Sequence, residues 1–257
     1  MYARRTRPGR ERNSGIATLR YDDRGFAAST GDVENVTTEG LKEDAAAGLS
    51  LLRRRFDRVG VVGHSEGGTI ALMLAAEGQA DFIVSLAGMI VPGKETLLAQ
   101  NRRALNEAGL DQHTVGAYCK ALGDSFDAAV EGRALPSPSG FDIPAPLQQN
   151  LAAVQAQLRM PYLRYFVGLD ISQRLGAVTC PVLALNGTLD TQVDCVANLG
   201  LLKDCFPDSQ QVRIIPVEGV NHLFQHCTTG NAAEYPRIEE TVAPEVLALI
   251  ADFLLQR

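Results

Sequence analysis

Short apolar runs alternate with longer segments of helical periodicity along most of the chain. Between the first two runs, for example, residues 38–56 repeat leucine and alanine at the spacing of one helix face. This alternation is typical of parallel strands joined by crossover helices, and it predicts an α/β fold. We expect a sheet of about five mainly parallel strands flanked by helices, with the strands at Ile16–Arg20, Val59–Gly63, Phe82–Ala87, Pro181–Asn186 and Val212–Val217.

One interval interrupts this alternation. About ninety residues separate the third and fourth apolar runs, far more than a single crossover needs. Helical patterns occupy residues 95–109, 111–132 and 146–158 of this interval. We therefore predict one α/β domain over residues 14–257 that carries a helical lid insertion at residues 95–176, with a separate helical domain as the alternative.

The composition, with 46% hydrophobic and 21% charged residues among 257, is that of a folded globular protein. The net charge of −6 gives no general attraction to nucleic acid or to an anionic membrane, so we expect a small-molecule partner.

Five arginines lie within the first twelve residues, which predicts a disordered basic tail at residues 1–13, with a basic binding arm as the alternative. No apolar run is long enough to span a membrane. We expect the chain as given to be soluble and cytoplasmic, with a periplasmic or secreted location as the alternative. The sequence also leaves open whether the chain forms a homodimer.

The sequence Gly63-His64-Ser65-Glu66-Gly67 follows the second predicted strand and opens a predicted helix. A Gly-x-Ser-x-Gly sequence in this context is typical of a tight strand-to-helix turn that exposes the serine hydroxyl. Glycines on both sides let the strand and the helix approach without side-chain collision. Because an unassisted serine hydroxyl is a poor nucleophile, Ser65 needs a base to accept its proton and a carboxylate to orient that base.

Candidates for both partners follow later predicted strands, in the order serine, acid, histidine. Asp190 comes after the fourth strand and His222 after the fifth, so both are predicted on loops at the carboxyl edge of a parallel sheet. We predict Ser65 as the nucleophile, His222 as the general base and Asp190 as its orienting acid. Asp194 and His226 are the alternatives, because each lies four residues further along the chain.

These residues give the chain a resemblance to the α/β-hydrolases. The segments Arg20–Gly25 and Ser29–Asp32, the turn at Ser65 and the sequence His222–Gln225 are similar to a bacterial branch that contains dienelactone hydrolases and prolyl-oligopeptidase-like esterases. The resemblance implies acyl transfer to water through an acyl-serine intermediate, with a carboxylic ester as the expected substrate and a peptide as the alternative. It also implies that the backbone amide of Glu66 stabilises the oxyanion. We expect no cofactor and no metal, since the four histidines do not form a ligand cluster with carboxylates or thiols.

The chain departs from the family pattern at its start. In the family, one strand lies between those that match Ile16–Arg20 and Val59–Gly63, and the loop after an early strand supplies a second oxyanion donor. No apolar run precedes Ile16 here, so we expect the N-terminal strands to be missing, through translation from a wrong methionine or fusion to unrelated sequence. A truncated chain would be catalytically impaired or inert, which is the hypothesis that competes with an active hydrolase.

Overall fold

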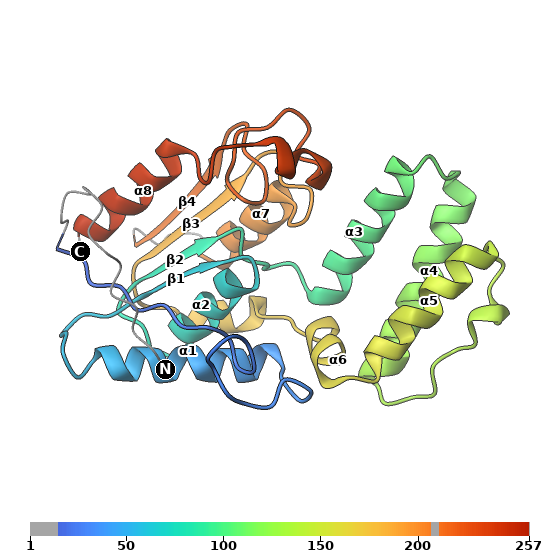
Figure 1. Ribbon diagram of the computed structural model, residues 1–257, viewed down its shortest axis with the longest axis horizontal. Helices are drawn as coiled ribbons and strands as arrows, with labels where there is room; N and C mark the ends of the chain where they lie inside the picture. Colours follow the sequence, from blue (N-terminus) through green and yellow to red (C-terminus); the bar gives the residue numbers. More distant parts are fainter. Residues whose placement is uncertain (1–14, 207–210, 257) are drawn as a thin grey trace.

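Four strands form the sheet of this protein, whose computed structural model describes residues 15–206 and 211–256. All neighbouring strands are parallel, as predicted for the α/β class. The predicted basic tail, residues 1–13, lies outside the described residues. The last four of the five predicted strands are confirmed, and they lie side by side in the order β1 (Val61–His64), β2 (Ile83–Leu86), β3 (Val182–Gly187) and β4 (Val212–Val217) (Figure 1).

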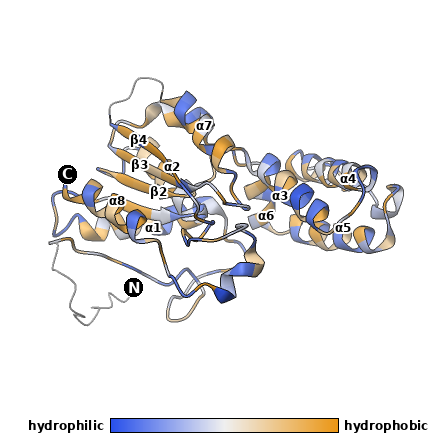
Figure 2. Cartoon of the chain, turned by 90° about the horizontal axis from the view of Figure 1, so that it is seen from above, coloured by the Kyte–Doolittle hydropathy of each residue, from blue (hydrophilic) through white to orange (hydrophobic). Residues whose placement is uncertain are grey.

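Helices lie on both faces of this sheet, and Figure 2 shows the apolar strands between them. They are α1 (Thr38–Leu52), α2 (Glu66–Ala76), α7 (Cys195–Cys205) and α8 (Pro244–Leu255), with the short 3-10 helices η2 (Ser172–Ala177) and η3 (Ala232–Arg237) in the connections. Within the described residues, no helix is both long and apolar enough to cross a bilayer.

Side chains of the central strands alternate between the two faces, as the two-residue period of a strand requires. On one face, Ile83 and Val182 pack with residues of α1, α2 and α7 in one core. On the other face, Val84 and Leu183 pack with Phe253 of α8 and its neighbours in a second core. β3 is buried along its whole length because it lies between two strands and under helices on both sides.

A helical lobe leaves the sheet after β2 and returns to it before β3 (Figure 1). It has helices in the three intervals where the periodicity predicts them, and their apolar faces form a separate core around Tyr118, Phe126 and Leu151. The last helix of the lobe, α6, lies between the other helices and the sheet (Figure 1). The lobe consists of α3 (Gly93–Glu107), α4 (Gln112–Val130), η1 (Pro138–Gly140), α5 (Ala145–Leu158) and α6 (Pro161–Val167).

The prediction of a first strand at Ile16–Arg20 is wrong. Residues 16–23 have no regular secondary structure and lie beside α1. The following residue, Arg24, forms hydrogen bonds to α1. The Arg24 guanidinium donates to the Asp44 carboxylate at 2.7 Å and to the Gly40 carbonyl at 2.8 Å. A strand forms only where a neighbouring strand supplies partners for its backbone, and this segment is held against a helix instead.

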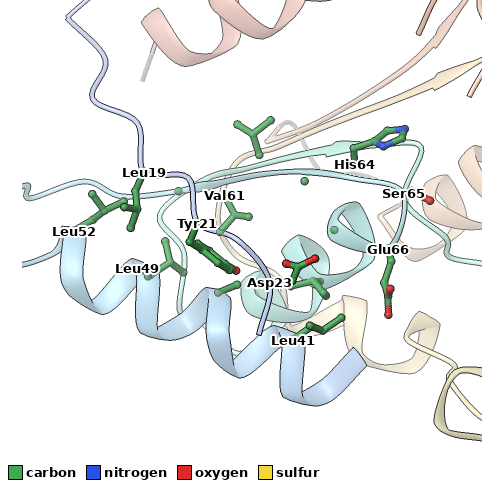
Figure 3. Close-up of a pocket in the computed structure, with 17 residues that line it drawn as sticks. Leu19, Tyr21, Asp23, Leu41, Leu49, Leu52, Val61, His64, Ser65 and Glu66 are labelled. Carbon is green, nitrogen blue, oxygen red and sulfur yellow. The ribbon is translucent and has the colours of Figure 1, made fainter. Parts of the chain in front are cut away.

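A groove of about 480 Å³ lies between this segment and β1 (Figure 3). Leu19 and Tyr21 line one side of it, and α1 and β1 line the others. Because the groove separates residues 16–23 from the sheet, β1 is an edge strand within the described part of the chain. Its residue Val62 is 50% exposed, in contrast to the buried residues of β2 and β3.

Candidate active site

The turn between β1 and α2 holds Ser65 in a strained backbone conformation. Its φ of 55° and ψ of −120° lie in a region that residues other than glycine rarely adopt. The Ser65 N–H donates to the Leu86 carbonyl of β2 at 2.8 Å, which fixes the turn at the carboxyl edge of the sheet. A Cβ atom at Gly63 would lie only 1.9 Å from the Gly67 carbonyl oxygen, so this close approach of strand and helix requires glycine. The predicted serine thus lies on a sharp strand-to-helix turn.

Asp190 lies on the loop after β3, and each of its carboxylate oxygens has a fixed partner. Oδ1 accepts hydrogen bonds from the backbone N–H of Gln192 at 2.8 Å and of Val193 at 2.9 Å. Oδ2 lies 2.7 Å from Nδ1 of His222. Both side chains are buried, and we call them the acid–histidine pair.

The loop after β4 presents His222 in a tight turn. The Asn221 side-chain oxygen accepts hydrogen bonds from the N–H groups of Leu223 at 2.9 Å and Gln225 at 3.0 Å. Phe224 has a φ of 59°, and its buried side chain packs into the core beneath α8. The imidazole therefore projects from a turn that is held by backbone and side-chain hydrogen bonds on both sides.

The two alternative residues have other partners. Asp194 begins α7 and accepts a hydrogen bond from the Ala197 N–H at 2.8 Å, as a helix N-cap does. The His226 ring lies at the surface between two carboxylates, 3.1 Å from Glu240 and 2.8 Å from Glu245. The hydrogen bond to Glu240, helped by the charge of both carboxylates, raises the pKa of His226 above its usual value. Neither residue takes part in the acid–histidine pair.

His64 joins the turn of Ser65 to the loop of His222. Its Nε2 lies 2.8 Å from the His222 carbonyl oxygen, which places a proton on Nε2, and the two imidazole centroids are 4.7 Å apart. Partial burial lowers the pKa of His64 and favours its neutral ring. Among the described residues the Ser65 hydroxyl makes no hydrogen bond to His222, a contact that tightens in many hydrolytic sites only when substrate binds. The structure brings Asp190 and His222 into contact and places Ser65 on the adjacent turn.

Glu66 follows the serine, and its side chain points away from Ser65 toward the start of α1 (Figure 3). One carboxylate oxygen accepts a hydrogen bond from the Thr38 hydroxyl at 2.6 Å, and the other accepts one from the Tyr162 hydroxyl at 2.7 Å. As the first residue of α2, Glu66 has a backbone N–H without an intrahelical partner, which leaves it available to an anion. The role of this amide as an oxyanion donor stays a prediction. The sequence gives no sign of the side-chain contacts, because their partners lie 28 and 96 positions away.

Other reactive groups of the described chain lie apart from this site. No group of three or more His, Cys, Asp or Glu side chains within residues 15–206 and 211–256 is arranged to hold a metal ion. All five cysteines are free thiols. Burial raises the pKa of Cys195 to about 11, so this thiol stays protonated at neutral pH. The chemistry that the site offers is that of a hydroxyl, an imidazole, a carboxylate and a helix N-terminus.

The fold and the site together define an α/β protein with a strained serine turn at the carboxyl edge of a parallel sheet. The model of the alpha/beta hydrolase family matches residues 7–230, so the chain belongs to that family. Two solved structures are similar to the chain at low sequence identity. An esterase from Pyrococcus furiosus gives a TM-score of 0.56 at 16% identity, with 95% of this chain and 71% of that chain covered. A hydrolase from Pseudomonas aeruginosa gives a TM-score of 0.49 at 19% identity, with 92% and 78% covered. No curated protein sequence matches the chain.

Proposed function

We propose that this chain is a serine hydrolase that cleaves a carboxylic ester. The acid–histidine pair carries the proposal, because Asp190 Oδ2 and His222 Nδ1 lie 2.7 Å apart and the loop of His222 contacts the turn of Ser65 through His64. A carboxylate in this position keeps a proton on Nδ1 and leaves Nε2 free to accept the proton of a serine hydroxyl. The similar fold of the esterase from Pyrococcus furiosus agrees with this reaction.

In the proposed reaction, Ser65 Oγ attacks the ester carbonyl carbon while His222 Nε2 accepts the hydroxyl proton. The oxyanion of the tetrahedral intermediate accepts a hydrogen bond from the Glu66 N–H. The bond to the alcohol oxygen then breaks, the imidazolium gives its proton to the leaving alkoxide, and an acyl-serine remains. A water molecule attacks the acyl group with the same base, which releases the carboxylic acid and restores the Ser65 hydroxyl.

The helical lobe is the proposed lid of this enzyme. A cavity of about 620 Å³ lies between α3 and the loop that carries Asp190, and it offers space for part of a substrate. Gln100 of α3 donates to the Gln192 carbonyl at 2.8 Å, and the N–H of the same Gln192 donates to Asp190. Membership of the dienelactone hydrolase-like branch stays a prediction from the motifs at Arg20–Gly25, Ser29–Asp32, Ser65 and His222–Gln225.

Labelling with a fluorophosphonate probe tests the proposal. The wild-type chain should be labelled and should hydrolyse p-nitrophenyl acetate. Ser65→Ala should be neither labelled by the probe nor able to hydrolyse the ester. Ser137→Ala, which removes an exposed serine of the helical lobe, is the matched control and should behave as wild type. Equal labelling of Ser65→Ala and wild type would contradict the nucleophile, and an unlabelled wild-type chain would favour the inert hypothesis.

A further inference from the structure

Glu66 is the point where three parts of the molecule meet. Its carboxylate receives the Thr38 hydroxyl from the start of α1 and the Tyr162 hydroxyl from α6 of the helical lobe. Thr38 is fully buried, and burial together with the Glu66 carboxylate raises the pKa of Tyr162, so its hydroxyl remains a donor over the pH range of activity. Hydrogen bonds between hydroxyls and a carboxylate are stronger than those between neutral groups.

A second tyrosine of α6 makes a contact of the same chemistry with another part of the core. The Tyr165 hydroxyl donates to the Glu39 carboxylate of α1 at 2.9 Å. Glu39 also accepts from the buried ammonium of Lys42 at 2.5 Å, and Lys42 pairs with Glu77 as well. Tyr165 thus ties the helical lobe to α1, whereas Tyr162 ties it to the residue that follows Ser65.

Resting on the proposed function, we propose that Glu66 is a positioning residue that links the helical lobe to the oxyanion donor. Its carboxylate, held at both oxygens by Thr38 and Tyr162, fixes the backbone N–H of the same residue. These bonds also turn the carboxylate away from Ser65 (Figure 3), so that its negative charge does not face the developing oxyanion. If α6 moved away from the core, Glu66 would lose the Tyr162 donor and keep the Thr38 donor, so its amide would be held less firmly.

Matched tyrosine variants test this link. Tyr162→Phe keeps the ring, which stacks on Phe166, and removes only the hydroxyl donor to Glu66. We expect kcat for p-nitrophenyl acetate to fall about tenfold while KM changes less than about twofold, because a misplaced oxyanion donor weakens binding of the transition state alone. Tyr165→Phe removes the equivalent bond to Glu39 and should leave kcat within about twofold of wild type. Equal losses in the two variants would overturn the proposal and indicate a merely structural tie.

Variants of Glu66 itself sharpen the test, since each keeps the backbone N–H. Glu66→Ala removes both side-chain contacts and should lower kcat more than Tyr162→Phe does. Glu66→Gln keeps one acceptor oxygen and adds an NH₂ group, which can donate a hydrogen bond to the Thr38 hydroxyl. We therefore expect its kcat to lie between those of Glu66→Ala and wild type. A Glu66→Gln enzyme no better than Glu66→Ala, or a Glu66→Ala enzyme with wild-type kcat, would contradict positioning by this side chain.

Hydrogen exchange gives a readout that does not depend on activity. The Gly68 and Thr69 amides donate to the Ser65 carbonyl at 2.9 and 3.2 Å, so their exchange reports opening of the serine turn. Exchange should accelerate in Tyr162→Phe and stay at the wild-type rate in Tyr165→Phe. If the wild-type chain shows neither labelling nor hydrolysis, the proposed function fails, and this exchange pattern alone supports or overturns the positioning role of Glu66.

Discussion

Asp190 and His222 come from the loops after the adjacent strands β3 and β4, whereas Ser65 follows β1, at the opposite edge of the described sheet. β3 is buried throughout, and the side chains of the acid–histidine pair are nearly inaccessible. In β1, by contrast, partly buried and exposed positions alternate, Val62 is half exposed, and a groove of about 480 Å³ extends along the strand to Ser65. We call these parts the base half and the nucleophile half of the site.

The two halves differ in where their order comes from. In the base half, the N–H groups of Gln192 and Val193 donate to Asp190. The Asn221 side-chain oxygen accepts from the Leu223 N–H, so hydrogen bonds within the two loops fix most of the geometry. The helical lobe contacts this half through Gln100, which donates to the Gln192 carbonyl. In the nucleophile half, the side chain after Ser65 is held by Tyr162, which belongs to the helical lobe. We infer that the base half is organised mainly by hydrogen bonds within its own loops and that the nucleophile half depends more on the helical lobe.

The largest effect is expected for Asp190→Asn in the base half. An amide at this position favours the wrong imidazole tautomer of His222, and such an acid-to-amide change costs about 10⁴ in kcat in a serine protease. Hydrolysis of p-nitrophenyl acetate at saturating substrate measures the loss.

Asp194→Asn is the control for this change, because it makes the same substitution four residues away. Asparagine is as good a helix N-cap as aspartate, so both kcat and the free energy of unfolding should stay near wild type. A loss of activity in Asp194→Asn as large as that in Asp190→Asn would show that the contact between Asp190 and His222 does not orient the base.

Local patterns were sufficient to predict much of this molecule. The four confirmed strands have short apolar runs, and the loops of Asp190 and His222 follow two of them, so their meeting at one sheet edge follows from parallel pairing. The segment Ile16–Arg20 has the same kind of run and forms no strand, because a strand also needs a neighbour, which the run does not encode. The contact between Glu66 and Tyr162 spans 96 positions and leaves no periodic signal in the sequence.

The difference in burial between the strands predicts an intermediate effect on stability. Val84 of β2 is fully buried, so Val84→Ala should lower the free energy of unfolding by about 1–3 kcal/mol through lost burial and a cavity. Val62→Ala in β1 should change it by less than about 0.5 kcal/mol, because the side chain is 50% exposed. Urea unfolding measures both changes, and equal losses would show that another surface covers β1 in solution.

The smallest effects separate the two halves by the sign of their pH dependence. His226, beside the base half, has a raised pKa, so its pairing with Glu240 and Glu245 contributes stability below about pH 6.5 that is lost as pH rises through the folded-state pKa. His64, in the nucleophile half, has a lowered pKa, so its contribution is present above about pH 6.5 and is lost as pH falls toward the folded-state pKa. Relative to wild type, His226→Gln should therefore be destabilised most at acidic pH, and His64→Gln should be destabilised least there. Urea midpoints measured from acidic to alkaline pH test both predictions. If the midpoints of the two variants changed with pH in the same way, the surroundings of the two histidines would not differ as the two halves of the site require.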